Sequence, residues 1–337
     1  MAAGAGVAMI AAIMAIWANR PESASSAQVT DDAYIRADIT FVAPEIAGRV
    51  EQVWVEENQA VRAGQLLAQI DDRDYALAVR SAQAVLQSAQ AAAQGLDAKI
   101  EVQHSMVRQA RAALDADLAN LQLARADYSR YRSLAADGSG TVQARQQAQA
   151  RLRVLQAQHA KDDAILQAEA GRLEVLRADL QRAQAEMQRA DAALAQARLD
   201  LAHTRIVAPI DGTVGRKQVR VGNFARVGEP FLTLVPLADI YVEANFRETQ
   251  LARMREGQPV RFTVDALPGR EFTGKVASLG PASGVSYSAI APHNATGNFT
   301  KIVQRLPVRI SVNRGQSDTD LLRVGMSVLP EVDVSAE

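Results

Sequence analysis

Cysteine is absent from this 337-residue chain, which excludes disulfide bonds, thiol catalysis and cysteine-ligated zinc. Aromatic residues make up only 4% of the sequence, whereas alanine, leucine, arginine and glutamine abound. Such a composition favours long packed helices over one large globular core. The formal net charge is −1, so no general attraction to nucleic acid or to anionic lipid is expected, and nucleic acid is not among the partners we predict.

Motifs for catalysis are also missing. The sequence contains neither a G-x-x-x-x-G-K-S/T phosphate loop nor an H-E-x-x-H motif. Its four histidines are scattered without metal-ligand spacing; they are His104, His159, His203 and His293. Acidic residues of the alanine-rich region mostly stand beside arginines at surface heptad positions, which is typical of a solvated face. We expect no enzymatic activity, no cofactor and no metal.

The chain begins with an apolar run. Residues 2–18 carry no charge, and the run includes Trp17 and stops before Arg20. A membrane span needs about 20 apolar residues, and tryptophan is enriched at membrane interfaces, so we predict a transmembrane anchor over residues 1–19. A cleaved signal peptide and a buried helix are the alternatives. The polar, serine-rich residues 20–30 predict a linker.

Two segments, 41–70 and 206–234, repeat the same pattern of hydrophobic residues and glycines. The matching pieces are Val42-Ala43-Pro44 with Val207-Ala208-Pro209, Gly48-Arg49-Val50 with Gly212-Thr213-Val214, and Val61-Arg62-Ala63-Gly64 with Arg226-Val227-Gly228. Short hydrophobic runs between turn residues are typical of strands. We therefore predict two halves of one small β domain, over residues 39–71 and 204–236.

Between the halves lies a long region with a heptad repeat, which predicts an a/d helix seam. In the first arm the seam comprises Val79, Leu86, Ala93, Ile100, Val107, Leu114, Leu121 and Tyr128, and three residues after each, Ala82, Ala89, Leu96, Gln103, Ala110, Asp117, Ala124 and Tyr131. In the second arm it comprises Leu152, His159, Leu166, Leu173, Leu180, Met187, Leu194 and Leu201. Gly95 and Gly171 lie within the arms, where they indicate bends, close approach or plain tolerance.

A glycine-containing turn separates the two arms. Gly138 and Gly140 break the helix and Thr141 can cap the next one. We predict an antiparallel coiled-coil hairpin over residues 72–203, with its tip at about 135–141. At 1.5 Å per residue each arm is about 95 Å long. A plain helical spacer without specific tip chemistry is the alternative.

The turn also fixes which residues face each other. Pairing around it places Asp117 beside His159 on the seam, where an ion pair or hydrogen bond would set the register of the hairpin. Alternatively, both side chains extend outward to solvent.

The last third of the chain is rich in strand patterns. We predict strands over residues 240–246, 260–264, 272–276, 302–312 and 324–334, and a helix over 248–255 that ends at Gly257. Residues 31–38 alternate suitably to join them as a further strand. The expected result is a small β-barrel over residues 237–334.

The repeated halves resemble lipoyl and biotinyl carrier domains, which attach their cofactor to a lysine where the halves join. Here Asp71-Asp72-Arg73-Asp74 occupies the join. The five lysines lie elsewhere, at Lys99, Lys161, Lys217, Lys275 and Lys301. The scaffold is therefore predicted without the carrier chemistry.

Longer motifs carry a second resemblance. They are Tyr241-Val242-Glu243-Ala244-Asn245-Phe246-Arg247-Glu248-Thr249-Gln250, Gly257-Gln258-Pro259-Val260, the run from Asn294 to Ile310, and Arg323-Val324-Gly325-Met326. The predicted parts follow one another in the order membrane anchor, split lipoyl-like sandwich, hairpin and barrel. With this order and these motifs, the chain from about 31 to 334 resembles the membrane-fusion, or periplasmic adaptor, proteins of the HlyD family, in particular its EmrA-like branch. The fold class implied is mixed α and β.

The resemblance implies a single-pass protein of the Gram-negative inner membrane with its bulk in the periplasm. Members of the family form rings, so a trimer or hexamer is implied here. They couple an inner-membrane pump, in this branch an EmrB-like major-facilitator exporter driven by protons, to a TolC-like outer-membrane channel. The implied function is multidrug efflux, and the partner pump supplies the energy for transport.

The family's hairpin tip has an Arg-Leu/Tyr-x-x-Leu pattern, followed by a Ser or Thr that opens the return helix. Residues at the corresponding positions are Arg130, Tyr131, Leu134 and Thr141, with Gly138 and Ser139 in the turn. The resemblance implies that these residues contact the channel. An arginine fork can donate to carbonyl or carboxylate groups, and Leu134 offers an apolar knob.

Three other functions stay open. The first is an adaptor for an ABC-type secretion or export system. The second is an envelope coiled-coil protein without a role in transport. The third is a cofactor carrier linked to an enzyme, against which the missing lysine argues.

Overall fold

The computed structural model describes residues 25–287 and 303–335. The anchor predicted over residues 1–19 lies outside these residues, as does the beginning of the predicted linker. Within the described ranges, no helix combines the length and apolar character that a membrane span requires. The chain divides into two compact units, one of which is the insertion Asp71–Thr204.

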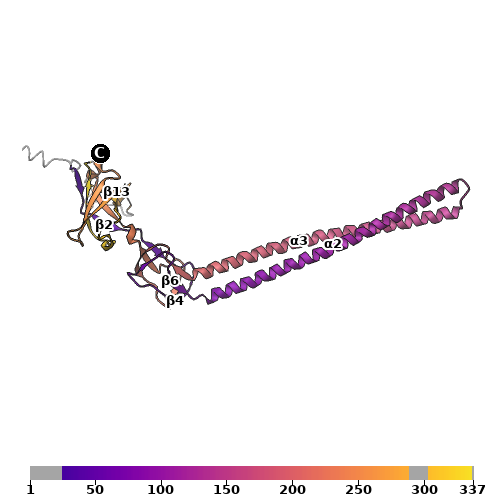
Figure 1. Ribbon diagram of the computed structural model, residues 1–337, viewed down its shortest axis with the longest axis horizontal. Coiled ribbons are helices and arrows are strands. Elements are labelled where there is room, and N and C mark those ends of the chain that lie inside the picture. The colour runs from indigo at the N-terminus through magenta and orange to yellow at the C-terminus, as the bar shows by residue number, and fades with distance from the viewer. Residues whose placement is uncertain (1–24, 288–302, 336–337) are drawn as a thin grey trace, which may run out of the picture. The chain divides into compact units, whose positions relative to one another are not determined.

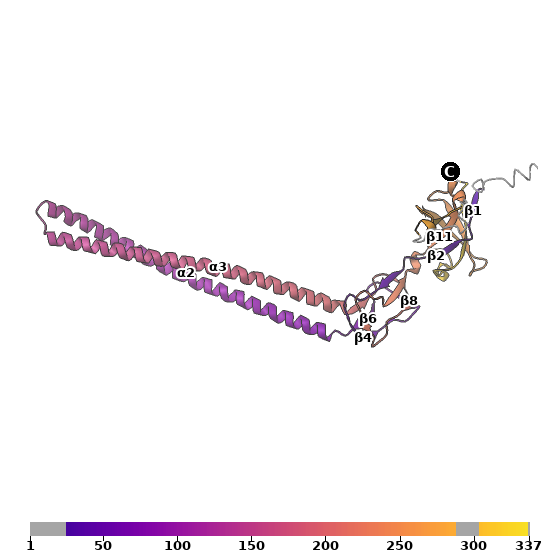
Figure 2. The same cartoon turned by 180° about the vertical axis from the view of Figure 1, so that it is seen from behind.

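Two long helices form the inserted unit. Helix α2 spans Arg73–Ala136 (64 residues) and helix α3 spans Val142–His203 (62 residues). They run side by side in opposite directions along their whole length, as Figures 1 and 2 show from two sides. The antiparallel helical hairpin predicted from the heptads and the turn is confirmed.

The contact between the helices follows the predicted seam. In α2 the buried residues are Ala93, Ile100, Gln103, Leu114, Leu121 and Ala124, and in α3 they are Leu173, Ala190 and Leu194. Every other predicted seam position is at least half-buried, with one exception. Tyr131 is 38% exposed, because the seam stops before the tip.

The insertion interrupts a β-sandwich whose strands come from both flanking segments. The first segment supplies β3 (Thr40–Val42), β4 (Gly48–Val53), β5 (Ala60–Val61) and β6 (Leu66–Ile70). The second supplies β7 (Arg205–Val207), β8 (Gly212–Lys217), β9 (Phe224–Ala225) and β10 (Leu232–Val235). They form two four-stranded sheets in the orders β3-β10-β8-β5 and β7-β6-β4-β9.

These two sheets are equivalent. Exchanging each strand for its counterpart in the repeat, β3 for β7, β4 for β8, β5 for β9 and β6 for β10, converts one strand order into the other. The main-chain hydrogen bonds follow the same rule: Asn58 N–H donates to Val214 O (2.8 Å), as Gly222 N–H donates to Val50 O (2.9 Å). Each half therefore completes the other, and β6 pairs with β7 through Gln69 and Arg205 where the helical insertion leaves and returns.

The remaining strands form one seven-stranded antiparallel sheet in the order β1-β15-β12-β13-β14-β11-β2. Its members are β1 (Ala27–Val29), β2 (Ala33–Arg36), β11 (Tyr241–Arg247), β12 (Pro259–Val264), β13 (Glu271–Leu279), β14 (Arg305–Val312) and β15 (Val328–Asp333). Short 3-10 helices lie between them: η2 (Leu237–Asp239), η3 (Glu248–Arg253), η4 (Gly284–Tyr287) and η5 (Thr319–Leu321).

The sheet curls into a barrel. Ile35 N–H donates to Met326 O (2.9 Å) and Gly325 N–H donates to Ile35 O (2.8 Å), which joins β2 to the segment before β15. Alternate residues point inward, so that Val242, Ala244 and Phe246 of β11 are fully buried. In the core, the rings of Phe262 and Phe272 stack with their centroids 5.6 Å apart. The strand predicted over residues 31–38 does join this barrel, beside β11.

Two predicted elements need correction. Residues 27–29 belong to the barrel as the edge strand β1 rather than to a linker, because Gln28 is buried and the main chain pairs with Val332 of β15. The helix predicted over 248–255 is a 3-10 helix that ends at Arg253. Met254 is extended and buried in the barrel core, and this pulls the chain out of the helix before Gly257.

Candidate functional site

The tip of the hairpin is a tight turn closed by main-chain hydrogen bonds. Asp137 N–H donates to Ser133 O (3.0 Å), Gly140 N–H donates to Leu134 O (2.8 Å), and Gly138 between them has a φ of 75°. Thr141 then caps α3, because its Oγ1 accepts from the N–H of Ala144 (3.1 Å). The turn is therefore defined by its own hydrogen bonds.

Around this turn, apolar side chains reach solvent. Tyr131 is 38% exposed, Leu134 is 37% exposed and Val142 is 57% exposed. Beside them, the guanidinium of Arg130 lies 3.5 Å from the Asp127 carboxylate and is mostly exposed. This end of the hairpin thus offers apolar contact area together with arginine donors that a weak surface ion pair leaves available.

The structure brings all six predicted tip residues, Arg130, Tyr131, Leu134, Gly138, Ser139 and Thr141, into one short segment at the turn. Two contributors were missed by the sequence reasoning. Val142 adds exposed apolar area at the first residue of α3. Gly140 permits the close approach of the chain to Leu134, since a Cβ at position 140 would lie 3.0 Å from Leu134 Cβ.

The predicted pairing of Asp117 with His159 does not form as a direct bond. Both residues lie at the expected level of the seam, but Asp117 Oδ2 and His159 Nδ1 are buried without a hydrogen-bond partner. The carboxyl group of Asp162, one helical turn beyond His159, takes the place beside Asp117. Residue 162 lies on the same face of α3 as 159, three positions further along. Either residue can therefore face Asp117, and pairing around the turn identifies only one of them.

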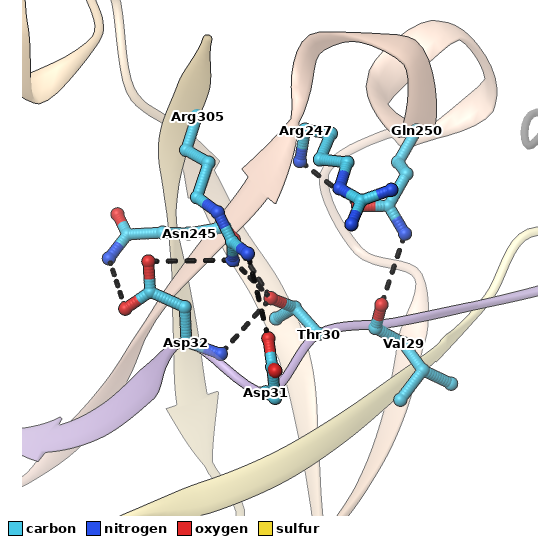
Figure 3. A network of polar contacts seen from close by, with 8 residues as sticks. All are labelled: Val29, Thr30, Asp31, Asp32, Asn245, Arg247, Gln250 and Arg305. Atoms are coloured by element: carbon cyan, nitrogen blue, oxygen red, sulfur yellow. Dashed lines mark hydrogen bonds and ion pairs between the residues drawn. The ribbon is translucent and has the colours of Figure 1, made fainter. Parts of the chain in front are cut away.

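A second polar cluster lies in the barrel, and Figure 3 shows it from close by. We call it the barrel latch and define it as Thr30, Asp31, Asp32, Asn245, Gln250 and Arg305. Arg305 at the start of β14 reaches both carboxylates, at 3.6 Å for Asp31 and 3.4 Å for Asp32. Its Nη1 also donates to Thr30 Oγ1 and to Asn245 O, both at 3.3 Å.

Main-chain and amide contacts extend the latch. Asn245 N–H donates to Asp32 O (2.8 Å) and Thr30 Oγ1 donates to Asn245 O (2.9 Å). The Gln250 side chain accepts from Arg247 N–H and donates to Val29 O, both at 3.0 Å (Figure 3). The motif residues Asn245, Gln250 and Arg305 therefore hold the segment that links β1 to β2 against β11 and β14.

The join of the sandwich halves has no lysine. Asp71 accepts from Arg73, with Nη2 and Oδ2 2.5 Å apart. Of the lysines, Lys217 lies in the sandwich, with its side chain only 17% exposed and its ammonium paired with Glu56. It also donates to Val55 O (3.2 Å), so it serves as an internal cross-link between the halves. Among the described residues no group of three or more histidine and acidic side chains could hold a metal ion.

A split sandwich that carries a long antiparallel hairpin, with a small barrel encoded after it, is the architecture of a barrel-sandwich hybrid protein. Residues 38–236 match the family model described as "RND MFP, barrel-sandwich hybrid domain", where MFP denotes membrane fusion protein. Residues 239–285 match "CusB-like, beta-barrel domain". The chain belongs to the membrane fusion protein family.

Curated relatives cover nearly the same length. The chain is 36% identical over 308 residues to the colistin resistance protein EmrA of Acinetobacter baumannii, a match that covers 91% of this chain and 87% of that protein. It is 37% identical over 310 residues to the fatty acid resistance protein FarA of Neisseria gonorrhoeae, covering 91% and 76%. A solved MacA–MexA chimeric protein, with the Pseudomonas aeruginosa MexA α-hairpin, shares the fold at a TM-score of 0.54 and 21% identity, covering 91% of this chain and 81% of that one.

Proposed function

We propose that this chain is the periplasmic adaptor of a tripartite efflux system. It is anchored in the inner membrane by residues 1–19, which makes it a single-pass protein with its bulk in the periplasm of a Gram-negative bacterium. The observation that carries the proposal is the hairpin, two helices of 64 and 62 residues that meet in an exposed apolar turn. Each helix is about 95 Å long, which suits a span between two membranes.

The tip is the proposed contact with a TolC-like outer-membrane channel. Tyr131, Leu134 and Val142 supply exposed apolar surface, and Arg130 supplies donors for carbonyl or carboxylate groups of the channel. Gly138, Ser139 and Thr141 shape the turn. A tyrosine together with an arginine, here Tyr131 and Arg130, is the combination in which the energetically dominant residues of protein interfaces are enriched.

The energy for transport comes from a partner, because the sequence has no nucleotide-binding loop. We propose an EmrB-like major-facilitator exporter as that partner, on the strength of relatives that are named for resistance to colistin and to fatty acids. Copies of the chain assemble into a ring, a trimer or a hexamer, that encloses the exported compound. An ABC-type exporter is the second candidate partner, and purified exporters of both classes can be compared for binding.

The tip assignment can be tested by charge substitution. Replacing Leu134 and Arg130 together by aspartate should abolish export, because the carboxylates remove the apolar contact and reverse the charge at the proposed interface. The matched control is the double replacement of Val175 and Arg177 by aspartate. Both residues lie within the rod. Val175 is 61% exposed, and Arg177 forms an ion pair with Glu174, three residues earlier, at 2.6 Å.

Export is measured as survival and dye extrusion in cells that lack the chromosomal gene. The proposal requires loss of export in the tip variant, with an unchanged helical circular dichroism signal and normal export in the control. Normal export by the tip variant would refute the tip contact. Deletion of the whole gene distinguishes an adaptor from an envelope coiled-coil protein without a role in transport. Loss of such a coiled-coil protein would weaken the envelope and leave export intact.

A further inference from the structure

Two polar layers interrupt the otherwise apolar seam of the hairpin. One contains Gln103 of α2 and Glu169 of α3. The other contains Asp117 of α2, with His159 and Asp162 of α3. Both place a carboxyl group between two helices, but they differ in what faces it.

In the first layer an amide satisfies the carboxylate. Gln103 is only 6% exposed, and its Nε2 donates to Glu169 Oε2 (2.5 Å) and to Glu169 O (3.0 Å). The amide carries its hydrogens at every pH. This layer therefore holds the helices together independently of protonation.

In the second layer a carboxyl faces a carboxyl. Asp117 lies between the buried seam residues Leu114 and Leu121, and its carboxyl is within hydrogen-bonding reach of Asp162. One oxygen of Asp162 accepts from Gln158 Nε2 (2.8 Å), whereas Asp117 Oδ2 is buried and has no donor. Two ionised carboxylates cannot hydrogen-bond to each other, so the contact requires a proton on one of them.

The charges around this layer can be named for both helices. On α2, Asp115 is exposed and paired with Arg111 (3.6 Å). On α3, His159 and Lys161 are the nearby cations, and Asp163 accepts from Gln167 (2.8 Å). Desolvation, followed by the hydrogen bond to Asp162 and the repulsion from its charge, raises the pKa of Asp117, and the cations His159 and Lys161 only partly oppose this.

We infer that Asp117 and Asp162 share one proton and that this proton closes the hairpin at their layer. The hairpin is thus a pH-responsive rod, closed at this level while one carboxyl holds the proton and locally open once both carboxyls are ionised. This layer lies about 20 residues from the turn in both helices and contains none of the tip residues.

The direction of the pH dependence follows from linkage. An acid whose pKa is raised in the folded state contributes stability that is fully present below its ordinary pKa and is lost as the pH rises through the raised value. Closure at this layer should therefore weaken with rising pH.

Hydrogen exchange of the purified full chain, followed by mass spectrometry at about pH 5 and about pH 8 and corrected for intrinsic exchange, tests this inference. Peptides that contain residues 117 and 162 should exchange severalfold faster at the higher pH. Asp117→Asn should abolish this change, since an asparagine amide donates to Asp162 at any pH. Asp162→Asn, with the amide on the other helix, should behave in the same way.

Two further variants sharpen the test. Asp115→Asn, two residues away on the exposed face, should retain the wild-type pH profile. Gln103→Glu converts the amide layer into a second carboxyl pair with Glu169, and should install the same pH dependence in peptides around 103 and 169. Equal exchange at both pH values in the wild type, or an unchanged profile in both Asp117→Asn and Asp162→Asn, would overturn the inference.

Discussion

Gly140 and Gly95 illustrate how single residues of one type carry different constraints in this hairpin. At position 140 a Cβ atom would meet Leu134 Cβ at 3.0 Å and the carbonyl carbon of Leu134 at 3.2 Å. At position 95, within α2, no atom other than the adjacent residues and backbone of the same helix lies within 4 Å of the corresponding point, and the same is true of Gly171. The glycine at the tip is thus required by close packing, and those in the arms are merely tolerated.

Alanine substitutions should therefore have opposite effects at these positions. Gly140→Ala should destabilise the turn by about 1 kcal/mol or more, because the neighbouring main chain has to move to accept the methyl group. Gly95→Ala should stabilise α2 by about 1 kcal/mol, the difference in helix propensity. Thermal denaturation followed by far-UV circular dichroism gives both values. A destabilised Gly95→Ala variant would reveal a constraint within the arm that the packing does not account for.

The side chains at the tip show what the sequence could and could not predict at this scale. Thr141 was identified as the cap of α3 from its place after two glycines, and the cap forms. The exposure of Tyr131 was not predicted, because its heptad position is the same as that of the buried Ala124. A heptad pattern fixes which side a residue faces, but the level at which the partner helix stops covering it depends on the geometry of the turn.

Among the elements, β1 and β2 depend on the barrel latch. The segment between them is short and polar, and its contacts run mainly to Asn245, Gln250 and Arg305. The latch fixes this segment, which follows the predicted membrane anchor in sequence, to the barrel. That placement gives the Asn245–Gln250 motif a structural role.

Arg305→Gln tests the latch. A glutamine cannot reach both carboxylates, so the segment around residues 30–32 should lose about 1–2 kcal/mol of local stability, less than a fully buried pair would lose because solvent screens these charges. Hydrogen exchange of peptides from this segment measures the loss. Arg314→Gln is the control, since Arg314 has a similar ion pair, with Asp239 at 2.6 Å, on the opposite end of β14 and outside the latch. Equal protection in wild type and Arg305→Gln would show that the latch does not hold the segment.

At the same scale, long elements were easier to predict than short ones. Both long helices could be predicted because the heptad repeat runs through some 130 residues and averages over local exceptions. Strand β1 has only three residues, and the buried one, Gln28, is polar. Its formation depends on pairing with β15, which is about 300 residues away in sequence. The pairing of Asp117 with Asp162 was missed for a similar reason, because the register of two helices specifies a layer and leaves the side-chain partner within it open.

For the whole molecule, the repeat in the sequence has a direct structural meaning. The two halves of the sandwich exchange strands and main-chain hydrogen bonds, as between Asn58 and Val214 and between Gly222 and Val50. Each half leaves hydrogen-bonding groups that only the other half satisfies. The hairpin returns the chain to the point where it left the sandwich, where Gln69 pairs with Arg205, so that both halves can form one domain.

The central claim is that the hairpin tip docks on an outer-membrane channel, and site-directed cross-linking in cells tests it most directly. The chain has no cysteine, so Leu134→Cys and Val175→Cys each introduce one reactive thiol, at the tip and in the rod. With a short bifunctional cross-linker that couples thiols to amines, position 134 should yield an adduct with the channel subunit and position 175 should not. No channel adduct from position 134, despite wild-type export by that variant, would contradict the account.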